Sequence, residues 1–534
     1  MPIRMVDDPN DSNERDEGSR SGGRGNGNRG FSGGGGGGLI NLLPLLLGLF
    51  RGKGIILLLV IVVGGYFLFG SDGGCGGGSA LFDQVSKLAT GGILDPRQFA
   101  KAEVYEGLED DAGKNPLPES VSLLKFAPPA RDQGAQGSCV AWSSAYAART
   151  ILEAARTGEN PASLAYSPAF LYNQIGLEGC QGSYIIRAME FMKERGAVPY
   201  NEFPYDENNC TRQPDRSLLE EAARNRMHGF NRLTSDEGTK EISIRSIKEH
   251  LATDAPVVIG MMVGESFMQP MMGQDLWEPA PGDNSMMGFG GHAMCVVGYD
   301  DRKYGGAFLI FNSWGPEWGN NGAAWVRYGD FKRFVREAYG VNAMQATAEM
   351  QNKPLEVSVG LVRNDNKQYI PLGASAASGV YQTRSNISPG TRFKMEVKNN
   401  TPCYIYVFGQ ETDGSSYILF PYPSKDNPQT TRHSPYCGIT GYRLFPKGMS
   451  MVADSIGNRD YMAVIVSKEP LDQWKINEAV SRASGSDYAA RVRQALQGVL
   501  NVGVNYSTGS GGTMELRARD ASARVMACVI EIGK

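Results

Sequence analysis

The chain has 534 residues, of which 41% are hydrophobic and 21% are charged. A chain of this length exceeds one ordinary domain, so we expect two or three domains once non-globular segments are set aside. Its 53 Lys and Arg residues are balanced by 57 Asp and Glu residues, giving a net charge of -4, and no dense basic stripe is present. This balance argues against nucleic acid as a partner.

Cysteine and histidine usage argues against a metal site. Eight cysteines are too few for a disulfide scaffold in a chain this long, and no two of them form a CxxC pair. The four histidines are widely spaced and lack the i, i+4 spacing that places two imidazoles on one helical face. We therefore expect neither a metal nor another cofactor.

The first part of the chain is predicted to be a disordered tail followed by a membrane anchor. Residues 1–38 are polar, charged and then glycine-rich, a composition that cannot bury enough apolar surface to fold. Residues 39–71 contain two apolar runs, and the second, 54–71, is uncharged and long enough to cross a bilayer as a helix. The first run, 39–50, is interrupted by Pro44, and whether it also enters the membrane stays open.

Charges around the second apolar run predict its orientation. Arg51 and Lys53 precede the run and Asp72 follows it, an asymmetry that places the N-terminus in the cytoplasm. We expect a single-pass protein whose later domains are extracytoplasmic, which means periplasmic in a Gram-negative cell. A cleaved signal peptide is disfavoured by the long preceding tail, and Cys75 lacks the surroundings of a lipoprotein site.

Two globular regions are predicted after a linker at 72–115. Over residues 116–350, helical patterns at 139–156 and 182–195 precede strand patterns such as HAMCVVGYDD, which indicates an α+β domain with segregated helices and strands. Residues 354–534 show alternating strands, a hairpin at Asp413-Gly414 and one helix near 488–500, which indicates a β-sandwich-like domain.

The stretch RDQGAQGSCVAWSSAYAART places Cys139 at the start of a predicted helix. The unpaired N–H groups and positive dipole end there favour a thiolate, although a cysteine among small residues is more often a structural one. Downstream, His292 leads an apolar strand in GFGGHAMCVVGYDD, and Asn312 in FNSWGPEWGNNG could orient its imidazole. Gln133 could donate to a developing oxyanion together with the Cys139 N–H.

These segments, in this order, resemble the papain family of cysteine peptidases. QGAQGSCVAW is similar to the active-site helix start of that family, GGHAMCVVGYD to its histidine strand, and NSWGPEWGNNG to its asparagine loop. The resemblance implies a two-lobed domain, with a helical lobe and a β-barrel-like lobe, and a bacterial branch of the family. It also implies hydrolysis of peptide bonds through an acyl-enzyme, with a peptide or protein as substrate.

The resemblance assigns a role to each residue of the set. Cys139 would be the nucleophile, His292 the general base and acid, Asn312 its orienting partner, Gln133 an oxyanion donor, and Trp314 a shield over the Asn312 to His292 hydrogen bond. It further implies a thiolate–imidazolium ion pair before substrate binds. The chain departs from the family pattern in having Val140 after the nucleophile and Gln136 where a cysteine is often found.

Further expectations concern a disulfide, a pocket and the last domain. Cys180 and Cys210 fall where family members have paired cysteines, and Cys403 and Cys437 could pair in the last domain. The candidates for a substrate pocket are Gly290, Gly291, Met287 and Phe289, with core packing as the alternative for the apolar ones, Phe267 included. The region 390–471 is similar to an uncharacterised β-rich domain of bacterial proteins, which implies binding of a protein or ligand, or a structural brace.

Two other functions remain possible from the sequence. A transglutaminase-like or peptidoglycan-directed enzyme also has a cysteine before a histidine, but neither class predicts the Gln133 spacing or the NSWG segment. A catalytically silent adaptor could bind peptides in an inherited cleft, yet the intact set of four polar residues argues against it. Because only a short linker precedes the catalytic region, we expect either that control of the enzyme differs from that of the family or that the linker and the last domain restrain it.

Overall fold

The computed structural model describes residues 2–8, 90–235, 241–283, 290–342, 352–375, 378–424, 427–485, 487–500 and 503–534. All of these belong to one compact unit. None of the helices in these ranges is both long and apolar enough to cross a bilayer. The expected span at 54–71, the run at 39–50 and Cys75 lie outside the described residues.

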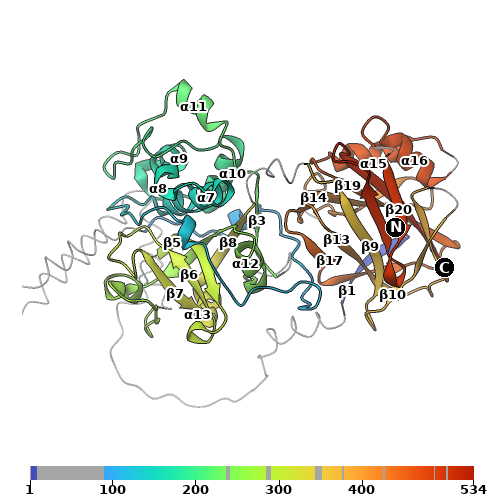
Figure 1. The fold of residues 1–534 in the computed structure, drawn as a ribbon, viewed down its shortest axis with the longest axis horizontal. Helices are drawn as coiled ribbons and strands as arrows, with labels where there is room; N and C mark the ends of the chain where they lie inside the picture. The colour runs from blue at the N-terminus through green and yellow to red at the C-terminus, as the bar shows by residue number, and fades with distance from the viewer. Residues whose placement is uncertain are drawn as a thin grey trace, which may run out of the picture. The chain divides into compact units, whose positions relative to one another are not determined.

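The first part of the fold separates helices from strands, as predicted. In Figure 1, the helices α7 to α11 gather on one side and the strands β5 to β7 lie on the other with α13. Its helices are α5 (Pro96–Phe99), η2 (Leu124–Phe126), α6 (Cys139–Ala141), η3 (Trp142–Arg149), α7 (Thr150–Thr157), α8 (Pro161–Leu164), α9 (Pro168–Ile175), η4 (Glu178–Cys180), α10 (Ile185–Glu194), α11 (Arg216–Ala222), α12 (Ile244–Leu251), η5 (Glu265–Phe267), η6 (Gln269–Met271), η7 (Lys303–Gly305) and α13 (Tyr328–Phe334).

These helices pack against one antiparallel sheet, whose strands differ in length. Its strands are β2 (Ser120–Ser122), β3 (Phe230–Arg232), β4 (Val257–Val263), β5 (Gly290–Asp300), β6 (Ala307–Phe311), β7 (Ala323–Arg327) and β8 (Val335–Val341). They are ordered β3-β8-β4-β5-β6-β7, with β2 beside β5. The two end strands do not pair with each other, so the expected barrel is not closed among the described strands. β5 is buried along most of its length, as its apolar sequence predicts.

The last part of the chain is a sandwich of two sheets. One sheet has the order β1-β18-β13-β9-β21-β20 and the other β11-β12-β22-β19-β14-β15. Its elements are β9 (Glu356–Arg363), β10 (Tyr369–Ile370), β11 (Leu372–Ala374), β12 (Val380–Thr383), β13 (Arg392–Asn399), β14 (Cys403–Gln410), β15 (Ser416–Phe420), β16 (Tyr436–Cys437), β17 (Gly441–Phe445), β18 (Met449–Ala453), β19 (Arg459–Ser467), α15 (Gln473–Arg482), α16 (Tyr488–Ala495), β20 (Val504–Thr508), η8 (Ser510–Gly512), β21 (Met514–Ala518) and β22 (Val525–Gly533).

The core of the sandwich lies between its two sheets. Residues such as Val359 on β9 and Val464 on β19 belong to one buried cluster. A second cluster on the outer face of the other sheet packs beneath α15 and α16. The hairpin predicted at Asp413-Gly414 joins β14 to β15. Helix α15 was not predicted, and α16 lies where a helix was expected.

Residues at the N-terminus form a strand of this sandwich, which corrects the expectation of a disordered tail there. β1 (Ile3–Asp7) pairs antiparallel with β18, with Ile3 opposite Ala453. Ile3 is 1% exposed, and its N–H donates to the Tyr417 hydroxyl at 3.0 Å. The Asp8 carboxylate forms an ion pair with Lys394 at 2.8 Å. A single membrane crossing between β1 and residue 90 would put β1 and β18 of one chain on opposite sides of the membrane. It is therefore incompatible with this pairing.

Residues 90–115, expected to be linker, are packed against the fold. Phe99 on α5 is 4% exposed and meets Tyr339 edge to face, with ring centroids 5.1 Å apart. Asp95 caps α5 by accepting from the Arg97 N–H. The Asp95 N–H donates to the Glu337 carboxylate on β8 at 3.1 Å. Side-chain burial and main-chain bonds therefore fix this segment, in contrast to a flexible tether.

We expect Ile3→Ala to destabilise the sandwich by about 2 to 4 kcal/mol, because it removes buried methyl groups from the core. Arg4→Ala, at the exposed neighbouring position, is the control and should change stability by less than about 0.5 kcal/mol. Hydrogen exchange of the β13 and β18 amides measures the difference. Equal protection in both variants would show that β1 does not contribute to the sandwich.

Glu337 predicts a pH dependence of stability. Burial raises the pKa of this carboxyl from 4.5 to about 7, although Tyr339 and the Asp95 N–H oppose the shift. The folded chain thus keeps a proton that the unfolded chain releases, so stability falls as pH rises from about 4.5 to 7. The expected loss is on the order of 3 kcal/mol.

Urea unfolding at pH 5 and pH 8 tests this expectation. Glu337→Gln should remove most of the pH dependence, whereas Glu278→Gln, whose side chain is 69% exposed, should leave it in place. If the pH dependence of stability persists in Glu337→Gln, other titratable groups cause it.

Candidate active site

Cys139 lies at the start of the long central helix, as predicted. α6 begins at Cys139 and continues without interruption through η3 and α7 to Thr157. The Cys139 side chain is fully buried, and its sulfur accepts from the Ala293 N–H on β5 at 3.4 Å. The helix start is therefore directly against the strand that carries His292.

Three of the predicted site residues lie close together where β5 begins and β6 ends, namely His292, Asn312 and Trp314. His292 Nε2 donates to Asn312 Oδ1 at 2.7 Å, and that oxygen also accepts from the Ser313 N–H at 2.8 Å. The Trp314 ring stacks on the imidazole, with centroids 4.3 Å apart and planes 19° apart. Nδ1 of His292 is buried and has no hydrogen-bond partner among the described residues. A neutral imidazole in this tautomer presents Nδ1 as its basic nitrogen.

Gln133 is fully buried beside this group. Its Nε2 donates to the Gln136 carbonyl at 2.9 Å, and its Oε1 accepts from the Ser313 hydroxyl at 2.6 Å. The Gln133 N–H donates to the Ser313 carbonyl at 2.8 Å. Ser313 therefore joins Gln133 to Asn312, a link that the NSWG segment contained but that sequence reasoning missed.

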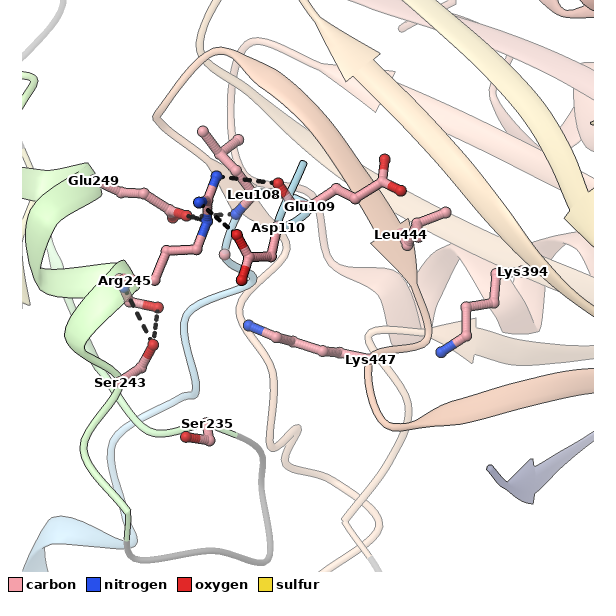
Figure 2. A pocket seen from close by; sticks show the side chains of 12 residues that line it. Leu108, Glu109, Asp110, Ser235, Ser243, Arg245, Glu249, Lys394, Leu444 and Lys447 are labelled. Carbon is pink, nitrogen blue, oxygen red and sulfur yellow. Dashed lines mark hydrogen bonds and ion pairs between the residues drawn. The ribbon is translucent and has the colours of Figure 1, made fainter. Parts of the chain in front are cut away.

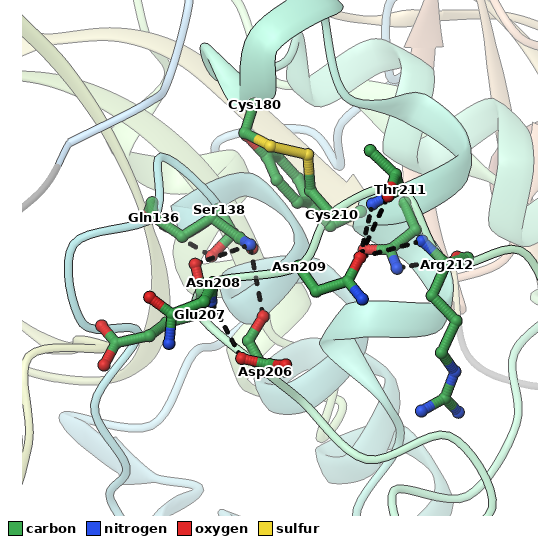
Figure 3. The surroundings of a disulfide bond; sticks show 12 residues. Gln136, Ser138, Cys180, Asp206, Glu207, Asn208, Asn209, Cys210, Thr211 and Arg212 are labelled. Carbon is green, nitrogen blue, oxygen red and sulfur yellow. Dashed lines mark hydrogen bonds between the residues drawn. A yellow bond between two sulfur atoms is a disulfide. The ribbon is translucent and has the colours of Figure 1, made fainter.

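A second loop holds the Gln133 to Ser138 segment in place. The Tyr205 hydroxyl donates to the Gln133 carbonyl at 2.7 Å and lies 2.6 Å from the Ser138 hydroxyl. Gln136 donates to the Glu207 carbonyl at 3.1 Å. Figure 3 shows this loop continuing to Cys210, which forms a disulfide with Cys180, as the resemblance implied. The covalent link thus closes the loop beside the Cys139 helix start.

The cleft between Cys139 and His292 contains a segment of the chain itself. Thr90 to Leu94, here called the strap, passes between the two walls. The Gly92 N–H donates to the Gly291 carbonyl at 3.1 Å, the Ile93 N–H to the Ser183 carbonyl at 3.0 Å, and the Ser183 N–H to the Gly91 carbonyl at 2.9 Å. Sequence reasoning missed the strap and placed it in the linker.

Glycine is required where the strap meets the walls. A Cβ on Gly91 would collide with the Gly137 carbonyl, and a Cβ on Gly291 would collide with the Gly92 carbonyl. A Cβ on Gly92 would approach the Ala293 nitrogen to 3.2 Å. The open wall predicted at Gly291 therefore exists, and the strap backbone fills it.

Burial under the strap leaves the thiol and the imidazole neutral. It raises the pKa of Cys139 to about 12, although N–H groups of Ala293 and Gly92 oppose the shift. It also lowers the pKa of His292 to about 4, with the Asn312 hydrogen bond opposing. Desolvation therefore disfavours both charges of the ion pair that the family resemblance implies.

The remaining predicted residues are placed as follows. Met287 and Phe289 lie outside the described residues, whereas Gly290 begins β5. Phe267 is fully buried among aromatic rings, including Trp277 and Trp318, so it belongs to the core. The Cys403 and Cys437 thiols are free and buried, although their Cα atoms are opposite each other in the β14 and β16 pair.

Comparisons with known proteins agree with this geometry. Residues 118–369 match the papain family cysteine protease profile, and residues 386–470 match a domain of unknown function, DUF4384. Human cathepsin L2 is 28% identical over 244 residues, covering 43% of this chain and 66% of the relative. Mouse cathepsin K is 28% identical over 284 residues, covering 51% of this chain and 76% of the relative.

A solved structure is also similar. Xylellain, a cysteine protease from Xylella fastidiosa, is 24% identical and has a TM-score of 0.40, covering 48% of this chain and 97% of that one. The residues that match the family profile include Cys139, His292 and Asn312. Residues 118–369 are therefore a papain-family cysteine protease domain, of a family of hydrolases, and a domain of unknown function follows them.

Proposed function

We propose that the chain hydrolyses peptide bonds with Cys139 as nucleophile, His292 as base and acid, and Asn312 as the residue that orients His292. The observation that carries this proposal is the 2.7 Å hydrogen bond from His292 Nε2 to Asn312 Oδ1 beside the start of the Cys139 helix. This bond fixes the tautomer that leaves Nδ1 to exchange a proton with the thiol.

In the proposed reaction, His292 Nδ1 takes the thiol proton while the Cys139 sulfur attacks a peptide carbonyl carbon. The Cys139 N–H and the Gln133 amide are the proposed donors to the resulting oxyanion. His292 then gives its proton to the leaving amine, and a thioester remains on the sulfur. Water, deprotonated by His292, attacks the thioester and releases the acid and the thiol.

The proposal includes a closed state. Both reacting side chains are fully buried, and the strap is hydrogen-bonded to Gly291 and Ser183 beside them. A substrate can therefore enter only after the strap leaves the cleft. Gly91→Val is the substitution expected to displace it, because the added side chain has no room against Gly137.

Alkylation with iodoacetamide, followed by peptide mapping, tests the nucleophile in the full-length Gly91→Val chain. Cys139 should react at least about tenfold faster than the buried Cys295, Cys403 and Cys437, because a neighbouring base increases its thiolate fraction. Adding His292→Ala should reduce the Cys139 rate to that of the other thiols, and peptide hydrolysis should disappear.

The outcome separates the alternatives. Fast labelling without hydrolysis of any peptide in a mixed library would favour another thiol chemistry or a silent, peptide-binding cleft. Labelling of Cys139 no faster than that of Cys403 would overturn its role as nucleophile.

We also propose that the apolar run at 54–71 attaches the chain to a membrane, on the basis of its length and lack of charge. The expected single crossing, with the catalytic domain extracytoplasmic, is incompatible with β1 and β18 in the same sheet. Attachment without crossing, or an even number of crossings, keeps both strands on one side.

Protease protection in sealed membrane vesicles distinguishes these topologies. With epitope tags at both ends, the β1 and β18 pairing predicts that both tags are cleaved, or both protected, in vesicles of one orientation. Cleavage of one tag and protection of the other would support a single crossing and contradict the pairing.

A further inference from the structure

We propose that the C-terminal domain, which has no assigned function, restrains the protease by clamping residues 103–115, the segment that continues from the strap. We call these residues the clamped segment. The proposal rests on the proposed peptidase activity for its kinetic readout, and on the hydrogen bonds described below for the clamp itself.

The clamped segment is hydrogen-bonded on one side to the catalytic part. The Arg232 N–H donates to the Glu103 carbonyl at 2.9 Å, and the Tyr105 N–H donates to the Arg232 carbonyl at 3.1 Å. Further along, the Leu108 N–H donates to the buried Glu249 carboxylate on α12 at 3.1 Å. The bonds to Arg232 place the clamped segment beside β3, as one further short strand at this edge of the sheet.

On its other side the same segment is hydrogen-bonded to the C-terminal domain. The Val104 N–H donates to the Arg432 carbonyl at 2.7 Å, and the Ser434 N–H donates to the Val104 carbonyl at 3.1 Å. Asn115 is 5% exposed and bonds both main-chain groups of Tyr442, at 3.0 and 2.9 Å. The short strand at Val104 thus has one hydrogen-bonded neighbour in the catalytic part and another in the C-terminal domain.

A buried arginine fixes this arrangement from the C-terminal domain. Arg443 is 1% exposed, and its Nε donates to the Glu106 carbonyl at 2.9 Å. Its Nη1 donates to Asn399 Oδ1 at 2.6 Å, and its Nη2 to the Ile439 carbonyl. The Glu106 carboxylate is equally buried and faces His433. Burial would raise the pKa of Glu106, but His433, Lys447 and Arg443 keep it below its usual range.

Figure 2 shows a pocket at the same junction. Arg245 on α12 donates to Asp110 at 2.7 Å, to the Glu109 carbonyl at 3.2 Å and to Glu249 at 3.0 Å. This group and Lys447 and Lys394 of the C-terminal domain line one cavity of about 300 Å³. The clamped segment therefore lines a polar junction in which both parts contribute charged side chains.

The strap would gain from such a restraint because of the kind of bonds that hold it. Its hydrogen bonds to the cleft walls are main-chain bonds around two glycines, the residues that lose the most conformational freedom on ordering. Fixing the downstream end at α5 and at the clamped segment raises the effective concentration of the strap at the cleft. Loosening the clamp should thus lower the occupancy of the strap without touching the reacting side chains.

Two variants of the full-length chain test the clamp from opposite sides. Asn115→Ala removes the two bonds to Tyr442 from the clamped segment, and Arg443→Met removes the buried charge from the C-terminal domain. Their matched controls are Asn366→Ala, in an exposed turn, and Arg517→Met, whose side chain is 65% exposed. Each chain is assayed for hydrolysis of a mixed peptide library and for hydrogen exchange at Gly92 and Ile93.

We expect both clamp variants to hydrolyse peptides about tenfold faster than the unaltered chain, a coupling of ordinary size, and to exchange the Gly92 and Ile93 amides faster. The controls should match the unaltered chain. Retained protection of the β19 and β22 amides shows that the sandwich stays folded, and Asn115→Ala supplies the result if Arg443→Met does not fold.

The failures of the two proposals differ. If Gly91→Val is active while both clamp variants and the controls keep the exchange rates of the unaltered chain, the clamp is overturned and the peptidase stands. If Gly91→Val is inactive and Cys139 is unreactive, the peptidase proposal fails. Exchange at Gly92 and Ile93 then still decides whether the C-terminal domain holds the strap.

Discussion

The close approach of backbone to backbone in the cleft is the constraint on which the rest of the catalytic part depends. Gly91 and Gly92 pass between Gly137 and Gly291 so closely that a Cβ on Gly91 would collide with Gly137, and a Cβ on Gly291 with Gly92. This close approach buries main-chain N–H and carbonyl groups of the strap. They are paired, because they form hydrogen bonds with Gly291 and Ser183. The glycines before His292, the disulfide near Cys139 and the packed segment after the strap all serve this one geometry.

Much of the site followed from the sequence because each of its residues is positioned by a local element. Cys139 begins a helix rich in small residues, and His292 leads an apolar strand that is buried along most of its length. Asn312 comes at the end of the next strand, so the short β5 to β6 connection brings it beside His292. The order of these elements needed no knowledge of long-range packing.

The strap, β1 and the clamped segment could not be predicted for a common physical reason. The strap and the clamped segment are held largely by main-chain hydrogen bonds, which carry no side-chain pattern, and their glycine or polar composition is that of a linker. β1 is too short to show a convincing period, and its partner β18 is separated from it by most of the chain. The orientation of the Gln133 side-chain amide depends on its hydrogen bond with Ser313. Ser313 lies in another loop, far along the chain, so this contact could not be predicted from the sequence.

Opening of the strap should change the chemistry of the dyad as well as access to it. Under the strap, burial raises the pKa of Cys139 and lowers that of His292, so proton transfer from sulfur to nitrogen would create two charges in an apolar enclosure. Water admitted to the cleft solvates both charges and stabilises the ion pair relative to the neutral pair. In the proposed reaction, a peptide that replaces the strap would therefore meet a thiol that is more acidic than the covered one. Occlusion by the strap and desolvation of the dyad would then restrain the proposed activity in the same direction.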